Sequence, residues 1–424
     1  MALLPAVAIV AIAAIAAMAA APRAARRAAR TFAITHANVV PMDSERVLRD
    51  HTIVVTGDRI AALAPDGAAV LPEGTPTIDA GGAYVMPGLI DMHVHIRRRE
   101  LRDYVYAGIT SVRNMWGYQA LPSTMRAIED GTLLGPTIYS ASPGLDASPG
   151  VWPETQFVDD PSQAESVVAA QVAAGWRFLK VYNSLSLESY DAIVDSARAH
   201  GIRFLGHVSN QVPIEHALDS GQASIEHLRG YDFALQRNPG GAAAWADIDM
   251  SRLPALAAHT AAAGTWNCPT IAVFDVLLRS VDPTTRERAI ANRAAVIRDL
   301  HQAGARLLAG TDSGIDLAVP GASIHVELGG LVAAGLTPYE AIRAATSGGA
   351  EFLEEEAEIG TIAPGRRADL LLIDGNPLED VDALRSIRTV ILRGSWIALD
   401  GSRTPLLPRV PERTVSPRDL SRPR

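Results

Sequence analysis

Short runs of alternating apolar and polar residues, separated by Gly, Asp and Pro, occur near both ends of the chain. They predict short β-strands joined by tight turns over residues 31–83, and again over 357–403. Because chain termini often lie close together, we expect the two segments to form one small composite β-sandwich domain. The rest of the chain would be inserted between them.

A different pattern occupies residues 84–356. Short apolar runs alternate with longer stretches of helical period, for instance 187–200. Eight strand-helix units in about 265 residues indicate an α/β fold of the TIM (β/α)8 barrel type, whose usual size is about 250 residues. A doubly wound sheet is the alternative, but it rarely needs eight units. The predicted strands end near His93, Arg113, Ser140, Lys180, His207, His227, Thr270 and Asp312.

The two extremes of the chain follow neither pattern. Residues 2–21 are Ala-rich, apolar and uncharged, and an Arg-rich linker continues to residue 30. This segment fits a signal peptide for export, periplasmic or secreted, and it also fits a membrane anchor of about 20 residues. If it is neither, we expect a cytoplasmic protein. Residues 404–424, rich in Pro and Arg, are expected to form a flexible C-terminal tail.

Composition narrows the classes of partner. Hydrophobic residues make up 48% of the 424 residues and charged residues 20%, as in soluble globular proteins. The net charge is -9, with acidic residues spread along the chain, so we expect no nucleic acid partner. The single cysteine, Cys268, excludes an internal disulfide and a cysteine-cluster metal site. We expect a small-molecule substrate, and the sequence leaves open whether the protein forms a homo-oligomer.

Histidines at predicted strand ends are the first sign of chemistry. His93 and His95 are two residues apart at the end of an apolar run. Alternate residues of a strand share a face, so both imidazoles can hold one metal ion. Such a pair also arises by chance. The metal interpretation is strengthened by His207, His227 and Asp312 at three other strand ends, because functional residues of a TIM barrel gather at that rim.

The use of lysine in this chain is the second sign of chemistry at the predicted strand ends. The chain has 37 Arg and one Lys, Lys180, at another predicted strand end. An ammonium beside a metal centre is repelled, so a lysine there must be neutral or chemically changed. Carbon dioxide can add to the neutral amine and form N6-carboxylysine, an anionic ligand able to bridge two metals. A lysine that reaches towards solvent is the alternative, which the use of arginine elsewhere weakens.

These motifs, in this order and spacing, resemble those of the amidohydrolase superfamily of metal-dependent hydrolases over about residues 33–400. Within it the chain most resembles the imidazolonepropionase-like branch, which includes Xaa-Pro dipeptidases. The motifs that carry the resemblance are residues 87–95, residues 179–182 around Lys180, His207, His227, residues 310–314 around Asp312, and residues 360–374.

The resemblance implies a binuclear site for two divalent metal ions, which are most often zinc. His93, His95 and Asp312 would hold one ion and His207 and His227 the other, with carboxylated Lys180 and a hydroxide as bridges. It implies hydrolysis of a C–N amide bond in an N-acyl amino acid or dipeptide-like substrate. Asp312 would act as the catalytic residue that carries the proton to the leaving nitrogen.

Two other functions compete with this one. A lactonase or esterase could use the same metal site. A non-catalytic amidohydrolase-like scaffold is a minor alternative, which the presence of all six ligand positions disfavours. Many dipeptidase relatives carry a Gly-Gly-His loop after the third strand, whereas this chain has Ser-Pro-Gly-Leu-Asp at 142–146. Dipeptidase specificity is therefore not carried over, and the loop 143–156 is expected to form a lid over the substrate.

Four further residues are candidate substrate contacts. Arg113 and Asn114 could bind a substrate carboxylate, with a structural ion pair as the equal alternative. Tyr182 could line the pocket, with core packing as the alternative. His325 is expected on the helix after the eighth strand, where a structural role is the main interpretation. The tryptophans Trp116, Trp152 and Trp266 are candidate apolar pocket walls.

Overall fold

A computed structural model describes residues 31–315 and 317–397. The predicted signal or anchor segment at 2–21, its linker and the tail at 404–424 lie outside the described residues. The described chain contains two sheets with a hydrophobic core beside each.

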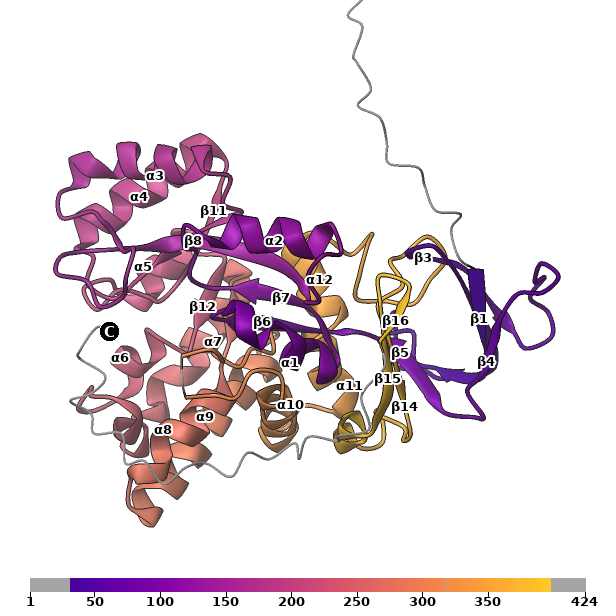
Figure 1. The fold of residues 1–424 in the computed structure, drawn as a ribbon. Coiled ribbons are helices and arrows are strands. Elements are labelled where there is room, and N and C mark those ends of the chain that lie inside the picture. The colour runs from indigo at the N-terminus through magenta and orange to yellow at the C-terminus, as the bar shows by residue number, and fades with distance from the viewer. Residues whose placement is uncertain (1–30, 316, 398–424) are drawn as a thin grey trace, which may run out of the picture. The chain divides into compact units, whose positions relative to one another are not determined.

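Strands from both ends of the chain pair in one eight-stranded sheet of mixed direction (Figure 1). The link between the two ends is β14, which lies antiparallel to β5 with Leu371 opposite Met86. Apolar side chains such as Ile34, Val55 and Leu370 form a core of its own on this sheet. The limits of the composite domain stay a prediction. The strands, which run in the order β16-β15-β14-β5-β1-β2-β3 with β4 beside β1, are β1 (Thr31–Val39), β2 (Leu48–Thr56), β3 (Arg59–Pro65), β4 (Thr77–Asp79), β5 (Tyr84–Pro87), β14 (Leu370–Ile373), β15 (Ile387–Leu392) and β16 (Ser395–Ile397).

The second sheet is parallel and forms a nearly closed TIM-like barrel, which confirms the predicted fold class. Almost all residues of its strands are buried, as expected for parallel strands that are covered on both faces. They are β6 (Leu89–Val94), β7 (Ile109–Asn114), β8 (Thr137–Asp146), β10 (Phe178–Val181), β11 (Arg203–Gly206), β12 (Ser224–Glu226) and β13 (Trp266–Cys268), and the short β9 (Gln156–Phe157) pairs with β8.

The eighth predicted strand is present as an extended segment without regular strand pairing. Leu308 N donates to Asn267 O on one side, and Ala309 O accepts from Met92 N on the other. Isolated bridges at Leu307 and Ser313 complete the contact with β13 and β6. The segment therefore closes the barrel with single hydrogen bonds and leads directly to Asp312.

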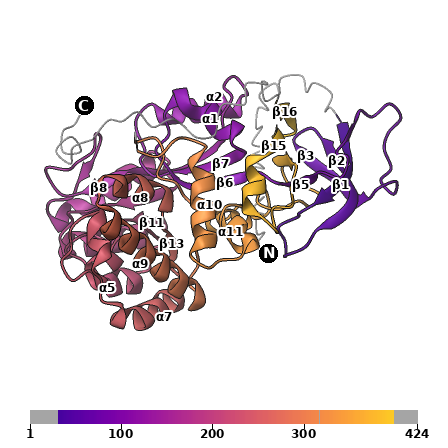
Figure 2. The same cartoon turned by 90° about the horizontal axis from the view of Figure 1, so that it is seen from below.

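Helices lie around the parallel strands in both views (Figure 1; Figure 2). The predicted helix at 187–200 is α4, which begins after the N-cap Ser186 and ends at the left-handed Gly201. Among the helices that the structure describes, none is long and apolar enough to cross a bilayer. The α-helices are α1 (Leu101–Tyr106), α2 (Leu121–Glu129), α3 (Ala164–Ala173), α4 (Leu187–His200), α5 (Ile214–Asp219), α6 (Tyr231–Leu235), α7 (Leu253–Ala263), α8 (Ile271–Leu277), α9 (Pro283–Gln302), α10 (Ser323–Ala333), α11 (Pro338–Ala344) and α12 (Ser347–Leu353).

Candidate metal centre

Three of the predicted ligands meet where β6 and the closing segment end. His93 is in β6, His95 lies just beyond this strand, and Asp312 follows the closing segment. Asp312 Oδ1 is 3.3 Å from His93 Nε2 and 3.0 Å from His95 Nε2. These are the three residues that the resemblance assigns to one ion.

The other three predicted ligands lie beside this group. Lys180 is in β10, and His207 and His227 directly follow β11 and β12. The ring centre of His227 is 4.5 Å from that of His93 and 4.9 Å from that of His207. Lys180, His207, His227 and Asp312 line one cavity. The barrel therefore gathers all six side chains at the C-terminal ends of its strands.

The donor atoms at this point suit a divalent cation. His93 Nε2 and Asp312 Oδ1 are buried, and neither forms a hydrogen bond within the described part of the chain. His93, His227 and Asp312 each offer one ligand atom, and these atoms lie within 4.8 Å of one another. Imidazole nitrogen and carboxylate oxygen are ligands that zinc prefers. This grouping sets His227 beside His93, and the predicted division of the ligands between two ions stays a prediction.

Outward hydrogen bonds orient three of the imidazoles. The Nδ1 atoms of His93, His207 and His227 each lie 2.7 Å from an oxygen, and these oxygens belong to Glu226, Asn183 and Thr270 respectively. An acceptor at Nδ1 places the ring proton there and leaves the Nε2 lone pair for a metal. Sequence reasoning missed all three partners, although Glu226 immediately precedes His227 in an apolar strand.

Glu226 is the most strongly held of these partners. It is fully buried and accepts hydrogen bonds from His93, from Ser224 and, at 2.9 Å, from Arg113 Nη2. Burial opposes its ionisation, but Arg113 and His93 outweigh burial and hold the pKa of Glu226 well below its usual value. Glu226 is thus a fixed negative charge behind His93.

Arg113 lies beneath the site and away from its opening. It is completely buried, and its guanidinium donates to Met92 O at 2.6 Å, Ser224 Oγ at 2.8 Å and Glu226. Of the two interpretations of Arg113, the geometry therefore favours the structural ion pair. A substrate carboxylate cannot reach this guanidinium without displacing Glu226.

Asn114 is similarly occupied by its own neighbours. Its amide donates to Trp116 O at 2.7 Å and to Ser140 Oγ at 3.0 Å, and its oxygen accepts from Ile96 N at 2.9 Å. The side chain is fully buried. These bonds connect the ends of β6 and β7 with the middle of β8, which favours a structural role.

The other two candidate substrate contacts differ from each other. Tyr182 lines the cavity, with its ring centre 4.3 Å from that of His207. His325 is buried on α10, and it is absent from the described lining of the cavity. Burial and the nearby charge of Arg385 lower the pKa of His325 to about 4, so the imidazole is neutral. The main, structural interpretation of His325 agrees with this position.

Lys180 is buried, and its side chain lies beside a glycine of the neighbouring strand. Gly206 on the neighbouring strand β11 faces this part of β10; a Cβ on Gly206 would lie 2.3 Å from Val181 O and 2.9 Å from Lys180 Cδ. Burial lowers the pKa of Lys180 to about 8, although the charges of Glu226 and Asp312 oppose the change. A part of the Lys180 population is therefore uncharged near neutral pH.

Two of the ligand residues have unusual backbone conformations. Asp312 has φ of 55° and His227 has φ of 64°, both in the left-handed region that residues other than glycine rarely adopt. Hydrogen bonds from Asp312 N to His93 O and from His227 N to Cys268 O, each 2.8 Å, hold these turns against the adjacent strands. Such strain is common at functional sites.

Five of the six predicted ligands line a cavity of about 320 Å³. One wall is apolar, and Arg229 is the charged residue of the described wall outside the predicted ligand set. Its guanidinium is held by Asp232 and Asn210. The lining residues are His95, Trp152, Lys180, Tyr182, Asn183, His207, His227, Arg229, Val273, Phe274, Leu277, Asp312, Ile315 and Leu317.

The predicted lid segment, 143–156, contributes Trp152 to the cavity. Residues 143–146 are part of β8, so the loop is shorter than predicted because it begins after a longer strand. The Trp152 ring is stacked 6.4 Å from that of His95, and Trp152 Nε1 donates to Tyr182 Oη at 2.7 Å. Trp116 packs 5.2 Å from Tyr182 behind the cavity wall. Trp266 instead packs against Phe352 at the start of β13.

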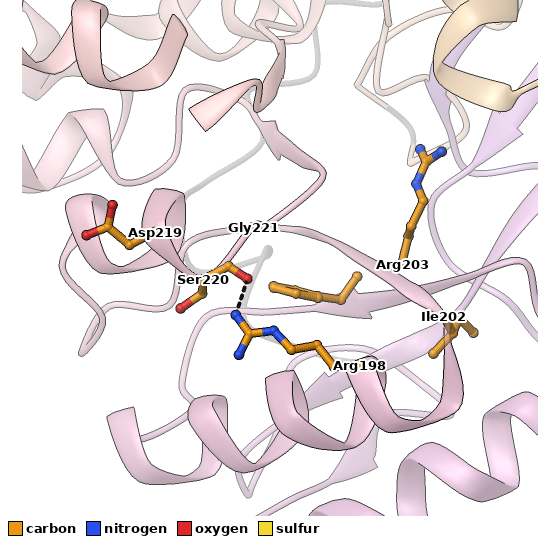
Figure 3. A pocket seen from close by; sticks show the side chains of 7 residues that line it. Arg198, Ile202, Arg203, Asp219, Ser220 and Gly221 are labelled. Atoms are coloured by element: carbon orange, nitrogen blue, oxygen red, sulfur yellow. Dashed lines mark hydrogen bonds between the residues drawn. The ribbon is translucent and has the colours of Figure 1, made fainter. Parts of the chain in front are cut away.

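A second cavity of about 320 Å³ lies at the opposite end of β11 (Figure 3). Arg198 Nη2 donates to Ser220 O at 3.0 Å across it. None of the predicted site residues lines this cavity. The chemistry-bearing side chains are therefore concentrated in the first one.

Comparison with known proteins agrees with this geometry. The amidohydrolase family model matches residues 84–397. Adenine deaminase 2 of Bradyrhizobium sp. (strain ORS 278) is 28% identical over 82% of this chain and 55% of the deaminase, so the chain spans about half the length of that relative. Imidazolonepropionase of Arthrobacter sp. (strain FB24) is 24% identical over 80% of this chain and 91% of that enzyme. A solved structure described as a prolidase, from Bifidobacterium longum, has a TM-score of 0.72 and 26% identity, and covers 87% of this chain and 94% of its own.

Proposed function

Because the chain belongs to the amidohydrolase family, we propose that it is a metal-dependent hydrolase of C–N amide bonds. The observation that carries this proposal is the convergence of six ligand-type side chains, five of which line one cavity while His93 lies buried against Asp312 and His227. An adenine deaminase and a protein described as a prolidase are both similar to this chain, and their names indicate attack at C–N bonds.

The residues present fit two divalent ions. Neither His93 Nε2 nor Asp312 Oδ1 forms a hydrogen bond within the described residues, which supports a cation at that point, and His95, His207 and His227 supply further imidazoles. Such ions, of which we propose zinc, would supply an activated water as nucleophile and polarise the scissile carbonyl. Lys180 would complete the set as a carbamate: its neutral nitrogen bonds to the carbon of CO2, one proton leaves, and an anionic oxygen ligand results.

The chain's own residues would carry the proton and position the substrate. Asp312 accepts the proton of the attacking water and passes it to the leaving nitrogen. Glu226 keeps His93 in the tautomer whose Nε2 faces the site. The apolar wall from Phe274 to Leu317 would hold an acyl or apolar side group, and Arg229 would bind a substrate carboxylate. These features favour N-acyl amino acids or dipeptides.

A substrate screen tests this proposal. Purified protein loaded with Zn²⁺ would be assayed against N-acyl amino acids, dipeptides and lactones, with Asp312→Asn as the inactive control. We expect amide turnover that is lost after chelation and restored by the metal. Turnover of lactones without turnover of any amide would overturn the amide proposal in favour of an ester hydrolase. No turnover in a metal-replete preparation would indicate a non-catalytic scaffold.

A further inference from the structure

We infer that Arg293, which lies outside the barrel strands, is a positioning residue for His227 and acts through Thr270. The inference rests on the proposed function, because it treats His227 as a metal ligand. Arg293 is on α9, and nothing in its sequence context marks it as functional.

Arg293 carries a buried charge whose donors are directed to two carbonyl groups. The side chain is 4% exposed, and within the described part of the chain it has no carboxylate within ion-pair distance. Its Nη2 donates to Pro269 O at 2.8 Å and its Nη1 to His227 O at 3.3 Å. Its guanidinium carbon lies 3.4 Å from the ring centre of Phe274. Burying a cation is costly, so this position calls for an explanation beyond packing.

A chain of hydrogen bonds connects Arg293 to the imidazole. Pro269 O accepts from Arg293 and also from Thr270 Oγ1, at 2.8 Å. Thr270 Oγ1 in turn lies 2.7 Å from His227 Nδ1. A hydroxyl has one proton, and Pro269 O, which can only accept, lies in position to receive it. With this proton directed to Pro269, the hydroxyl accepts from His227, so that the imidazole proton lies on Nδ1 and Nε2 is free for a metal.

Arg293 also spans two strained turns. His227, Leu228 and Thr270 have φ of 64°, 58° and 51°, and none of them is glycine. The two carbonyls that Arg293 binds lie within these turns, one after β12 and one after β13. The guanidinium thus ties together the backbone that presents His227 and the backbone that presents its acceptor. Of the three histidines with outward acceptors, this one depends on a side chain from an outer helix.

A double-mutant cycle on metal affinity tests the inference. Zn²⁺ affinity would be measured by competition with a chelator for the wild type, Arg293→Met, Thr270→Val and the double variant. Arg298→Met is the matched control, because Arg298 is an exposed arginine on the same helix. Circular dichroism and thermal unfolding would show which variants fold.

We expect Arg293→Met and Thr270→Val each to weaken Zn²⁺ binding by about 10- to 100-fold, the usual effect of losing a partner of a ligand. The double variant should bind Zn²⁺ no more weakly than the single variant with the lower affinity, because both substitutions break the same chain of hydrogen bonds. Arg298→Met should bind as the wild type does, and Arg293→Lys should recover part of the affinity.

Three results would overturn the inference: a folded Arg293→Met with wild-type affinity, a Thr270→Val with wild-type affinity, or losses that add in the double variant. If Arg293→Met does not fold, Thr270→Val and Arg293→Lys decide the matter. The proposed function fails separately, if the wild type itself binds no metal or cleaves no amide.

Discussion

The residues that orient the ligands are as important for this site as the ligands themselves. Glu226 accepts from His93 and neutralises Arg113 in a place with no solvent. In Glu226→Gln, the amide could still accept from His93, but Arg113 would be a buried cation without its partner. We expect a loss of about 3–5 kcal/mol in the free energy of unfolding and about 10-fold or more in metal affinity. Urea unfolding and metal content after dialysis would measure both, and wild-type values for both would refute this role of Glu226.

Lys180 offers a second residue-level prediction. An arginine keeps the positive charge but cannot form a carbamate, so Lys180→Arg should lose both metal and activity. Lys180→Ala should also lose them, with partial recovery when a small carboxylic acid is added to occupy the place of the carbamate. Metal analysis and the amide assay would check each variant. Full activity in Lys180→Arg would contradict the role proposed for this lysine.

Glu327 should make stability depend on pH. It is fully buried on α10, and burial raises its pKa from 4.5 to about 8. Between these two values the folded carboxyl keeps its proton while the unfolded one has lost it. Raising the pH across this window therefore lowers the free energy of unfolding, by at most about 1.4 kcal/mol per pH unit.

Glu327→Gln tests this, because glutamine cannot ionise and can still accept from Ala272 N, as Glu327 does at 2.9 Å. Denaturant unfolding of both proteins from pH 5 to 8 should show the variant gaining stability relative to the wild type as the pH rises. Parallel curves would mean that Glu327 does not titrate in this window.

At the scale of elements, the periodicity of the sequence was sufficient to predict the parallel strands and helices, and the strand ends located six ligand-type residues that the structure brings together. The periodicity could not separate a paired strand from the extended segment before Asp312, because pairing depends on distant neighbours: Asn267 is 41 residues from Leu308, and Met92 is 217 residues from Ala309. It also could not decide between the two roles of Arg113. The contact that favours the structural role is with Glu226, which is 113 residues away.

The loop that follows β8 is an element that contributes Trp152 to the wall of the cavity. Trp152 stacks against His95 and donates to Tyr182, but it is not a predicted ligand. Trp152→Ala should raise KM by about 10-fold, since it removes most of one apolar contact surface, and leave the metal content unchanged. Val151→Ala, on an exposed neighbour in the same loop, is the control. A Trp152→Ala enzyme with wild-type KM would remove this loop from substrate binding.

At the scale of the whole molecule, the contact between the two sheets explains why the motif at 360–374 occurs together with the predicted ligands. This segment contains β14, which pairs with β5, and β5 leads through Gly88 into β6 and His93. Arg367 Nη2 donates to Ser111 Oγ on β7 at 3.1 Å and links this segment to the barrel. The segment at 360–374 therefore supports the strand that leads to the candidate metal centre, although it holds none of the predicted ligands.

Metal stoichiometry tests the central claim most directly. The protein would be purified in the presence of Zn²⁺, freed of loosely bound metal by gel filtration, and analysed by plasma mass spectrometry. We predict two zinc ions per chain in the wild type and fewer than one in Lys180→Arg. A wild-type chain that is folded and binds no divalent metal under these conditions would contradict the account of the site.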